Sequence, residues 1–291
     1  MKNKTELKFL AAIAIFGSIG LFLEFIGLPR GIVAFGRSLF GTLFVLAVVL
    51  LRGKKPDKEA IRKNLRWLIL SGMSLGFNWI FLFTAYEVSS LALGILCNYL
   101  APVLVVLIAP ILWKDKLTLP KMLCVGAAFV GIVFVSGLLD GDLSAVNVEG
   151  IVMGLLSAVT FVFIVVFNRK LDGVTAFDKA VVQLAVATVT IFPYALFESV
   201  TREFTVDPVS VLLVVVLGFF HTGVAYCFYF DALGKISTQA FAVIGYLEPV
   251  MAVLISAFLL DTPMTVFGWI GAVLIIGAAL AGELLPGAKE K

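Results

Sequence analysis

Residues 90–112 have the sequence SLALGILCNYLAPVLVVLIAPIL, which contains no charged side chain. A helix needs about 20 apolar residues to cross the hydrocarbon core of a bilayer. Backbone polar groups in lipid must be hydrogen-bonded within the protein, and this run is too long and too uniformly apolar for a barrel strand. The stretch therefore predicts a transmembrane α-helix.

The rest of the chain has the same character. Hydrophobic residues make up 61% of the 291 residues and charged residues only 14%, a balance that does not suit a water-soluble domain, whose surface must be covered with polar side chains. We therefore expect an all-α integral membrane protein, with the lipid bilayer as its solvent. The ten predicted transmembrane helices are residues 8–27, 31–51, 67–86, 90–112, 119–138, 149–167, 176–197, 209–230, 238–260 and 265–285.

Composition also excludes some classes of partner. The net charge is only +3, and the Lys and Arg side chains lie in short loops between apolar runs rather than on one basic face, so nucleic acid is not an expected partner. Cys97, Cys124 and Cys227 lie inside apolar segments and show no Cys-x-x-Cys spacing, so we expect small buried side chains rather than disulfides or metal ligands. The sequence predicts no metal and no cofactor, and it does not specify an oligomeric state.

The loops predict the orientation in the membrane. Cytoplasmic loops carry an excess of Lys and Arg, and most of the 22 such residues fall on one side of the predicted bundle, including those of the loop 52–66. The opposite loops contain only Arg30 and Arg202. We therefore expect a multi-pass protein of the cytoplasmic membrane with the loop 52–66 and both termini in the cytoplasm.

The two halves of the chain resemble each other. A shift of 147 residues places Asn98-Tyr-Leu-Ala-Pro-Val103 on Gly245-Tyr-Leu-Glu-Pro-Val250. This similarity predicts two repeats, residues 1–142 and 143–291, with five spans in each. Because five is odd, the second repeat must insert upside down relative to the first.

Inverted repeats indicate transport. Transporters built in this way bind substrate near the bilayer midplane, at the interface of the two repeats, and expose it to one side at a time. Pro102 and Pro249 are equivalent under the shift, and each removes an amide donor, so we expect each to loosen its helix beside a central cavity. With a gap of one residue, Thr42 also falls on Thr188.

Short motifs resemble those of the EamA-type transporters of the drug/metabolite transporter superfamily. Phe16-Gly-Ser18 resembles the aromatic-Gly start of the first helix, Arg37 matches a frequent early Arg, and Tyr246-Leu-Glu-Pro-Val250 resembles the "LEP" signature of the second repeat. The resemblance implies secondary transport of a small-molecule substrate without ATP hydrolysis. It commonly implies export of amino acids or related metabolites, although some members import solutes.

Glu248 is the first candidate for substrate binding. It lies near the middle of the predicted span 238–260, where a charge costs about 2.5 to 3.5 kcal/mol. No basic residue in that span can neutralise it, so its partner must be another helix, a substrate cation or a coupled proton. The other candidate substrate-binding residues are Arg37, Asn98, Trp79, Tyr226 and His221.

Each of these residues also has a structural interpretation. Trp79 and Tyr226 are equivalent under the shift and could wall a shared cavity or simply pack. Asn98 and His221 could be interhelical hydrogen-bond partners. Arg37 could form a structural salt bridge with Glu24, because the two lie on either side of one predicted helical hairpin.

Three alternative functions remain open at the level of sequence, and one of them is a non-transporting membrane scaffold or sensor, which would have little interaction surface beyond the loop 52–66. Import of a cationic amine would use Glu248 as the counter-charge, with aromatic rings around the cation. An intramembrane serine hydrolase is suggested by Gly72-Met-Ser74-Leu-Gly76, since His221 falls opposite Ser74 under the shift. A nucleophile elbow needs a strained turn between a strand and a helix, whereas small residues four apart inside a membrane helix usually admit a neighbouring helix. We therefore expect no catalytic residues and no enzymatic activity.

Overall fold

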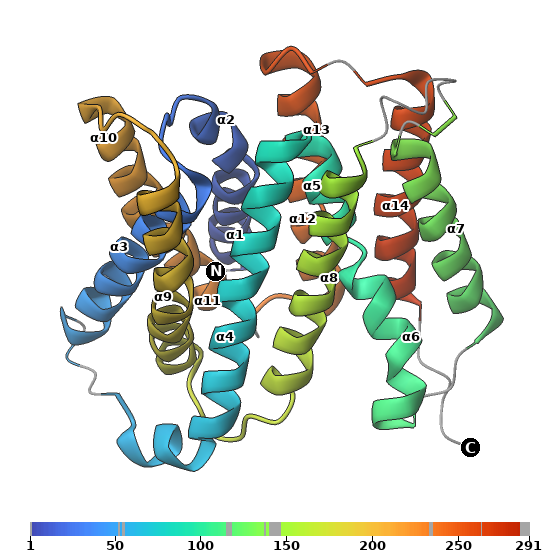
Figure 1. Ribbon diagram of the computed structural model, residues 1–291. Helices are drawn as coiled ribbons and strands as arrows, with labels where there is room; N and C mark the ends of the chain where they lie inside the picture. Colours follow the sequence, from blue (N-terminus) through green and yellow to red (C-terminus); the bar gives the residue numbers. More distant parts are fainter. Residues whose placement is uncertain are drawn as a thin grey trace.

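The computed structural model is helical throughout the chain that it describes, which comprises residues 2–51, 53, 56–114, 118–136, 138–139, 147–232, 235–262 and 264–285, and it has no strand there (Figure 1). The helices in chain order are α1 (Lys2–Gly17), α2 (Ile19–Glu24), α3 (Arg30–Leu51), α4 (Lys58–Val88), α5 (Leu91–Asn98), α6 (Ala101–Trp113), α7 (Leu119–Val135), α8 (Val148–Asn168), α9 (Ala176–Thr201), α10 (Pro208–Val216), the π-helix η2 (Leu217–Val224), α11 (Ala225–Ala232), α12 (Thr238–Gly245), α13 (Leu247–Leu259) and α14 (Val266–Leu284).

The predicted membrane class is confirmed. Eight helical segments of the described chain are long and apolar enough to cross a bilayer. Two further apolar helices, Leu119–Val135 and Val243–Leu259, are shorter and coincide with the fifth and ninth predicted spans. Helix length and composition therefore support eight of the ten predicted spans directly and leave two as predictions.

The helices form one bundle around α4, which packs against both α8 and α9 (Figure 1). At one edge, α7 packs against α14, and at the other α3 packs against α9 and η2. Behind α4, α1 packs against α11 and α13, while α5 packs against α8 and α13. The segment from α10 through η2 to α11 is a single span, Pro208–Ala232, with a π-helical middle.

Glycines allow α9 to approach α4 closely. A Cβ atom at Gly72 would lie 2.6 Å from Cβ of Val186, and one at Gly76 would lie 2.8 Å from Cβ of Thr190. Ser74, between the two glycines, donates a hydrogen bond to the carbonyl of Leu70 in the same helix (2.8 Å). The expected role of these glycines in helix packing is confirmed, and the strand-to-helix turn that a nucleophile elbow needs is absent from this continuous helix.

Two of the spans are interrupted at equivalent places. One breaks between α5 and α6, at Tyr99 and Leu100, and the other breaks at Tyr246, between α12 and α13. Pro102 and Pro249 each lie in the first turn after the break, where an amide has no partner within the helix in any case. The prediction that each proline loosens its helix is confirmed.

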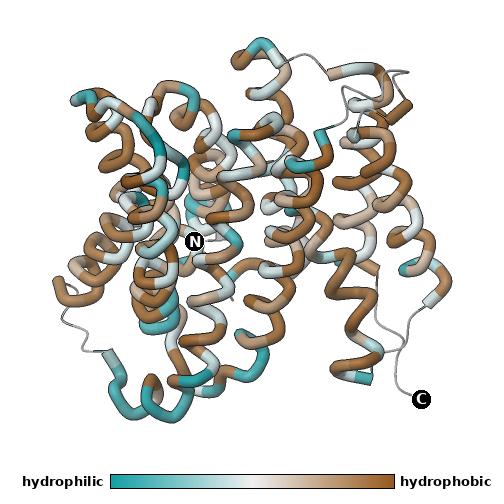
Figure 2. The backbone as a smooth tube through the Cα atoms, viewed as in Figure 1, coloured by the Kyte–Doolittle hydropathy of each residue, from teal (hydrophilic) through white to brown (hydrophobic). Residues whose placement is uncertain are grey.

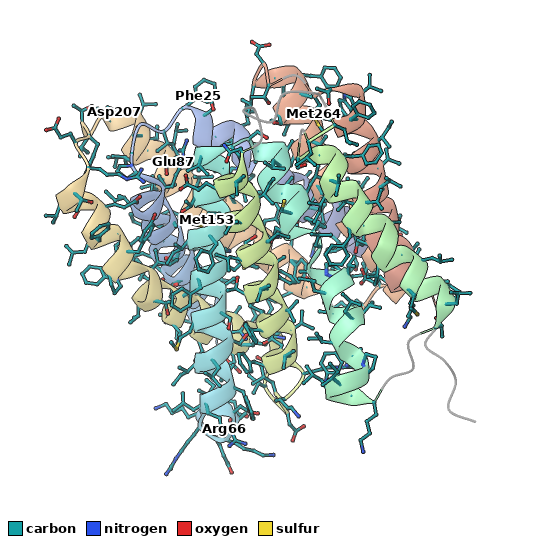
Figure 3. The ribbon with its side chains drawn as sticks, turned by 45° about the vertical axis from the view of Figure 1, so that its right-hand side comes forward. Phe25, Arg66, Glu87, Met153, Asp207 and Met264 are labelled. Atoms are coloured by element: carbon teal, nitrogen blue, oxygen red, sulfur yellow. The ribbon has the colours of Figure 1, made fainter. Side chains whose placement is uncertain are left out.

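Polar residues gather at the two ends of the bundle, and apolar residues dominate the middle (Figure 2). Arg66 lies at one end, whereas Glu87 and Asp207 lie at the other (Figure 3). Asp207 caps α10, and the hydrogen bonds that its carboxylate accepts from the hydroxyl and the amide of Ser210 hold the pKa of that carboxyl below its usual range. The predicted loop 52–66 is in part helical, because α4 begins at Lys58. Its described end at Arg66 lies opposite the acidic residues Glu87 and Asp207, although which end faces the cytoplasm stays a prediction.

Candidate functional site

Glu248 accepts a hydrogen bond from a tyrosine of the other half of the chain. The Tyr99 hydroxyl lies 3.1 Å from Oε2 of Glu248. Glu248 is half-buried in the first turn of α13, where unpaired backbone amides favour a negative charge. Its backbone lies close to α1, since a Cβ atom at Gly17 would be 3.2 Å from the Glu248 carbonyl oxygen. The predicted intramembrane carboxylate is thus held by a neutral donor.

Tyrosines surround this carboxylate. The chain has six tyrosines; Tyr99 is hydrogen-bonded to Glu248, and Tyr246 is two residues before it in the chain. Tyr86, Tyr226 and Tyr229 are close enough to interact with it electrostatically. The ring of Tyr246 packs against that of Tyr99. Tyrosine hydroxyls and rings from the two helix breaks therefore lie at this carboxylate.

Arg37 is buried on the other side of this region. Its side chain is only 5% exposed, and its Nε donates a hydrogen bond to Oγ1 of Thr222 (2.9 Å). The guanidinium carbon lies 4.3 Å from the centroid of the Trp79 ring and 5.5 Å from that of Phe83. Arg37 also interacts electrostatically with Glu248. No ion pair joins Arg37 to any carboxylate within the described residues, so its charge is stabilised by an aromatic face and a hydroxyl.

The expected salt bridge between Glu24 and Arg37 is wrong. Glu24 is exposed at the end of α2, whereas Arg37 turns inward to Trp79 on α4 and Thr222 on η2. The hairpin between the two residues directs their side chains to different surroundings. Spans one and two are therefore not joined by this pair.

His221 lies in the π-helical segment and is fully buried. Its Nε2 is 3.2 Å from Oγ of Ser18, the residue between α1 and α2. The Phe22 ring packs edge-on against the imidazole, with centroids 4.5 Å apart. His221 also precedes Thr222, the hydrogen-bond partner of Arg37. A π-helical turn in a membrane span is often a functional feature, and here it presents a histidine and a threonine to the interior of the bundle.

Asn98 belongs to a different set of contacts. Its side-chain oxygen accepts hydrogen bonds from Nδ2 of Asn78 and from Oγ of Ser157, both at 3.1 Å. These bonds join α4, α5 and α8, and within the described residues Asn98 makes none to Glu248. The structure therefore brings Asn98 to an interhelical junction and places its neighbour Tyr99 at the carboxylate.

The other predicted residues lie together. Trp79 supports Arg37. Tyr226 stacks on Phe230 with ring centroids 5.5 Å apart, and it interacts electrostatically with both Arg37 and Glu248. Arg37, Trp79, Tyr226 and Glu248 thus share one region, and His221 borders it. Sequence reasoning missed Tyr99, which follows the candidate Asn98 directly and is the equivalent of Tyr246.

Comparison with known proteins identifies the family. The model of the EamA-like transporter family matches residues 3–137 and again residues 148–281. The chain belongs to the EamA-like transporter family. It is therefore a membrane transporter of the drug/metabolite transporter superfamily.

Relatives of this EamA-like protein agree with that assignment. An uncharacterized transporter of Bacillus subtilis, YxxF, is 28% identical over 268 residues, which cover 91% of this chain and 83% of the relative. A second from the same organism, YyaM, is 26% identical over 247 residues, which cover 82% of this chain and 80% of the relative. A crystal structure 21% identical to this chain matches it with a TM-score of 0.65, covering 97% of this chain and 98% of its own, and supports the fold alone.

Proposed function

We propose that this EamA-like transporter carries a small polar or amphipathic metabolite, an amino acid or a related compound, by alternating access across the cytoplasmic membrane. Export is the direction that the family resemblance favours. The observation that carries the proposal is a pair of charged residues, the buried Arg37 and the half-buried Glu248, beside tyrosines at places where helices are interrupted. Charged groups at this depth are typical of a substrate or ion pathway.

The proposal includes ten transmembrane helices arranged as two inverted repeats, residues 1–142 and 143–291. Such an arrangement requires that each contact between helices have a counterpart. The packing of α1 on α11 corresponds to that of α8 on α4, the packing of α1 on α12 corresponds to that of α8 on α5, and the packing of α1 on α13 corresponds to that of α8 on α6. The pairs α3–α9 and α7–α14 each join equivalent helices, and the pair α5–α13 joins the equivalent fourth and ninth spans. Thr42 and Thr188, aligned from the sequence, lie with their hydroxyl oxygens 3.4 Å apart.

Interrupted spans suit this mechanism. In transporters with inverted repeats, discontinuous helices place polar groups and helix ends at the substrate site near the midplane. The breaks at Ser18, Tyr99 and Tyr246, together with the π-helix Leu217–Val224, all border the region between Arg37 and Glu248. Rocking of one repeat against the other about these breaks would expose that region to one side and then to the other.

Glu248 has one of two roles in this mechanism: it binds a substrate ammonium group, or it carries a coupled proton. Import of a cationic amine is the competing function, because a carboxylate among aromatic rings suits a cation. The buried guanidinium of Arg37 opposes that reading, since it would repel the same cation. The serine hydrolase has no such support, because Ser74 is hydrogen-bonded within its own helix.

Flux into proteoliposomes tests the proposal. A thermal-shift screen against amino acids, amines and nucleosides would first select a labelled solute, because a ligand that binds only the folded state raises apparent stability. Glu248→Gln keeps the size of the side chain and removes its charge, so we expect net transport to be abolished. The control is Glu24→Gln, which changes an exposed carboxylate and should leave transport unchanged.

The same assay distinguishes the two roles of Glu248, which are substrate binding and proton transfer. Exchange of labelled for unlabelled solute across the membrane does not need a net proton movement, so exchange should survive Glu248→Gln if the group only carries a proton. Loss of both net transport and exchange would assign it to substrate binding. Near-normal, pH-dependent net transport by folded Glu248→Gln protein would make the carboxylate structural and contradict the proposal.

A further inference from the structure

The positive charge of Arg37 has no anionic partner among the residues that the structure describes. Its Nε donates to the neutral hydroxyl of Thr222, and its terminal amino groups have no acceptor among the described residues. The ring of Trp79 stabilises the cation through its face. Burial of a guanidinium without a counter-charge is costly. A side chain that is 5% exposed with free donors is therefore suited to receive an anion.

Among the described residues, the negative charge of Glu248 has no cationic partner either, and its side-chain hydrogen bond comes from the neutral hydroxyl of Tyr99. Contacts between helices connect it to the surroundings of Arg37. Thr222, the hydrogen-bond partner of Arg37, lies one turn before Tyr226 in the same span. The Tyr226 ring packs against a phenylalanine of α1 (centroids 5.5 Å apart), and the same end of α1 lies against the backbone at Glu248. The two charges therefore have neighbouring surroundings, and within the described residues they form no salt bridge.

We infer that Arg37 and Glu248 are the two ends of a binding site for a zwitterion, in which Arg37 binds the carboxylate of an α-amino acid and Glu248 binds its ammonium group. This inference rests on the proposed function and narrows its substrate to molecules that carry both groups. A guanidinium can bind a carboxylate through two parallel hydrogen bonds, and an ammonium group offers three donors to a carboxylate and to neighbouring hydroxyls. The side chain of the amino acid would then face the tyrosine rings.

Each end of the site excludes one class of competitor. A cationic amine would satisfy Glu248 but would leave Arg37 unpaired beside a second positive charge. An organic anion would satisfy Arg37 and leave Glu248 unpaired in the same way. A buried charge that loses its partner is strongly penalised, and a site built for a polar group rejects the analogue that lacks it. A zwitterion alone pairs both charges and adds no net charge to the membrane interior.

The test uses one amino acid and two analogues that each lack one charge. With leucine as the probe, the analogues are leucinamide, which lacks the carboxylate, and 4-methylpentanoate, which lacks the ammonium group. Any other standard amino acid that the protein binds better can replace leucine, with its own amide and deaminated acid. We expect the amino acid to compete for transport in proteoliposomes at least about tenfold better than either analogue.

Substitution of Arg37 or Glu248 should then change which of the three compounds the protein binds best. Arg37→Gln should lower the affinity for the amino acid about tenfold or more. Its affinity for the amide should equal or exceed that of the wild-type protein, because no positive charge is left to repel the amide. Because Glu248→Gln should abolish net transport, its preference is measured by thermal shift, where the amino acid should stabilise it less and the deaminated acid should stabilise it more than they stabilise the wild type. Arg30→Gln, on the same helix as Arg37, is the matched control, because Arg30 donates to backbone carbonyls at the end of the bundle and should not alter the ranking. Where Arg37→Gln does not fold, Arg37→Lys keeps the charge and should retain weakened amino-acid transport.

Failure of this inference differs from failure of the proposed function. If the wild-type protein responds to leucinamide or to 4-methylpentanoate as well as to the amino acid, transport stands and the zwitterion site is wrong. If folded Arg37→Gln and Glu248→Gln proteins lose all three compounds equally, the charges are structural and the inference is overturned. If monodisperse wild-type protein moves no amino acid, amine or organic acid, the proposed function itself fails.

Discussion

The ring of Tyr99 lies 5.7 Å from the ring of Tyr246, with the two planes inclined by 60°. The two residues are separated by the offset of the sequence repeat, and each occupies the break between two helices of its span. A contact between equivalent residues is expected near a two-fold axis, where each partner meets its own counterpart. The chemistry differs on the two sides, because Ala101 in the first half corresponds to Glu248 in the second.

This asymmetry predicts different effects for two conservative substitutions. Tyr99→Phe removes the hydroxyl that donates to Glu248, and a hydrogen bond to a charged group contributes about 1.5 to 3 kcal/mol. We expect substrate affinity in proteoliposomes to change at least about tenfold. Tyr246→Phe is the control, since within the described residues the Tyr246 hydroxyl donates no hydrogen bond to Glu248 and has the carboxylate of Glu283 as its neighbour. Equal losses in the two variants would show that packing of the two rings, rather than the bond to Glu248, is what matters.

The orientation of the protein can be tested by cysteine labelling. Lys58 and Glu203 are both exposed and belong to the basic and the acidic ends of the bundle. A cysteine at Glu203 should react with an impermeant thiol reagent added to intact cells, and a cysteine at Lys58 should not, because basic loops stay in the cytoplasm. The native Cys97 and Cys227 are buried and give little background, and Cys124, which is half-buried, is first replaced by Ser. Labelling at Lys58 alone would reverse the predicted topology.

The sequence predicted most of the fold because the relevant signals are local. Apolar runs about 20 residues long specify membrane helices without knowledge of the neighbours. Pro102 and Pro249 located both helix breaks, because a missing amide donor acts on its own helix. The glycines of α4 indicated where a second helix approaches, although α9 as that helix could not be named from the sequence.

The direction of a side chain was the part that sequence could not supply. Asn98 and Tyr99 are adjacent, and adjacent helical residues point about 100° apart, so which of the two faces Glu248 depends on how the helix is rotated in the bundle. Arg37 and Glu24 were paired on the basis of one hairpin, whereas the partners of Arg37 come from α4 and η2. Such contacts between distant segments are set by tertiary packing.

Helix packing at the glycines of α4 gives a stability prediction. Gly72→Ala would place a methyl group 2.6 Å from Cβ of Val186 and 2.9 Å from the carbonyl oxygen of Gln183, so α4 and α9 must separate. Overpacking of this kind costs about 1 to 3 kcal/mol, and the apparent melting temperature in detergent should fall. Gly126→Ala is the matched control in α7, where a Cβ atom meets nothing within 4 Å. It should be neutral or slightly stabilising, because Ala favours a helix by about 1 kcal/mol over Gly. A melting temperature of Gly72→Ala equal to that of Gly126→Ala would contradict the close approach of α9.

Glu198 connects three helices at the acidic end of the bundle, and its removal should destabilise the protein more than removal of an exposed ion pair. Its side chain is 1% exposed. Oε2 accepts a hydrogen bond from the amide of Gly31 at the start of α3 (2.6 Å), and Oε1 lies 3.2 Å from Arg202, which also pairs with Glu87 on α4. Glu198→Gln keeps the volume but weakens a charge-assisted bond to a helix N-terminus and the pair with Arg202, so we expect a loss of about 1.5 to 3 kcal/mol.

The matched control for Glu198→Gln is Lys63→Gln, which breaks the pair between Lys63 and Asp172. These side chains are 69% and 82% exposed, and Lys63 lies one turn before Arg66, which is at the end of the bundle opposite Glu87. Exposed pairs contribute about 0 to 1 kcal/mol because water and salt screen them. The comparison is made by thermal unfolding in one detergent at two salt concentrations. The effect of Glu198→Gln should persist at high salt, because buried pairs are screened much less, whereas the small effect of Lys63→Gln should vanish. Equal shifts that both disappear with salt would mean that Glu198 acts as an ordinary surface charge and does not hold α3, α4 and α9 together.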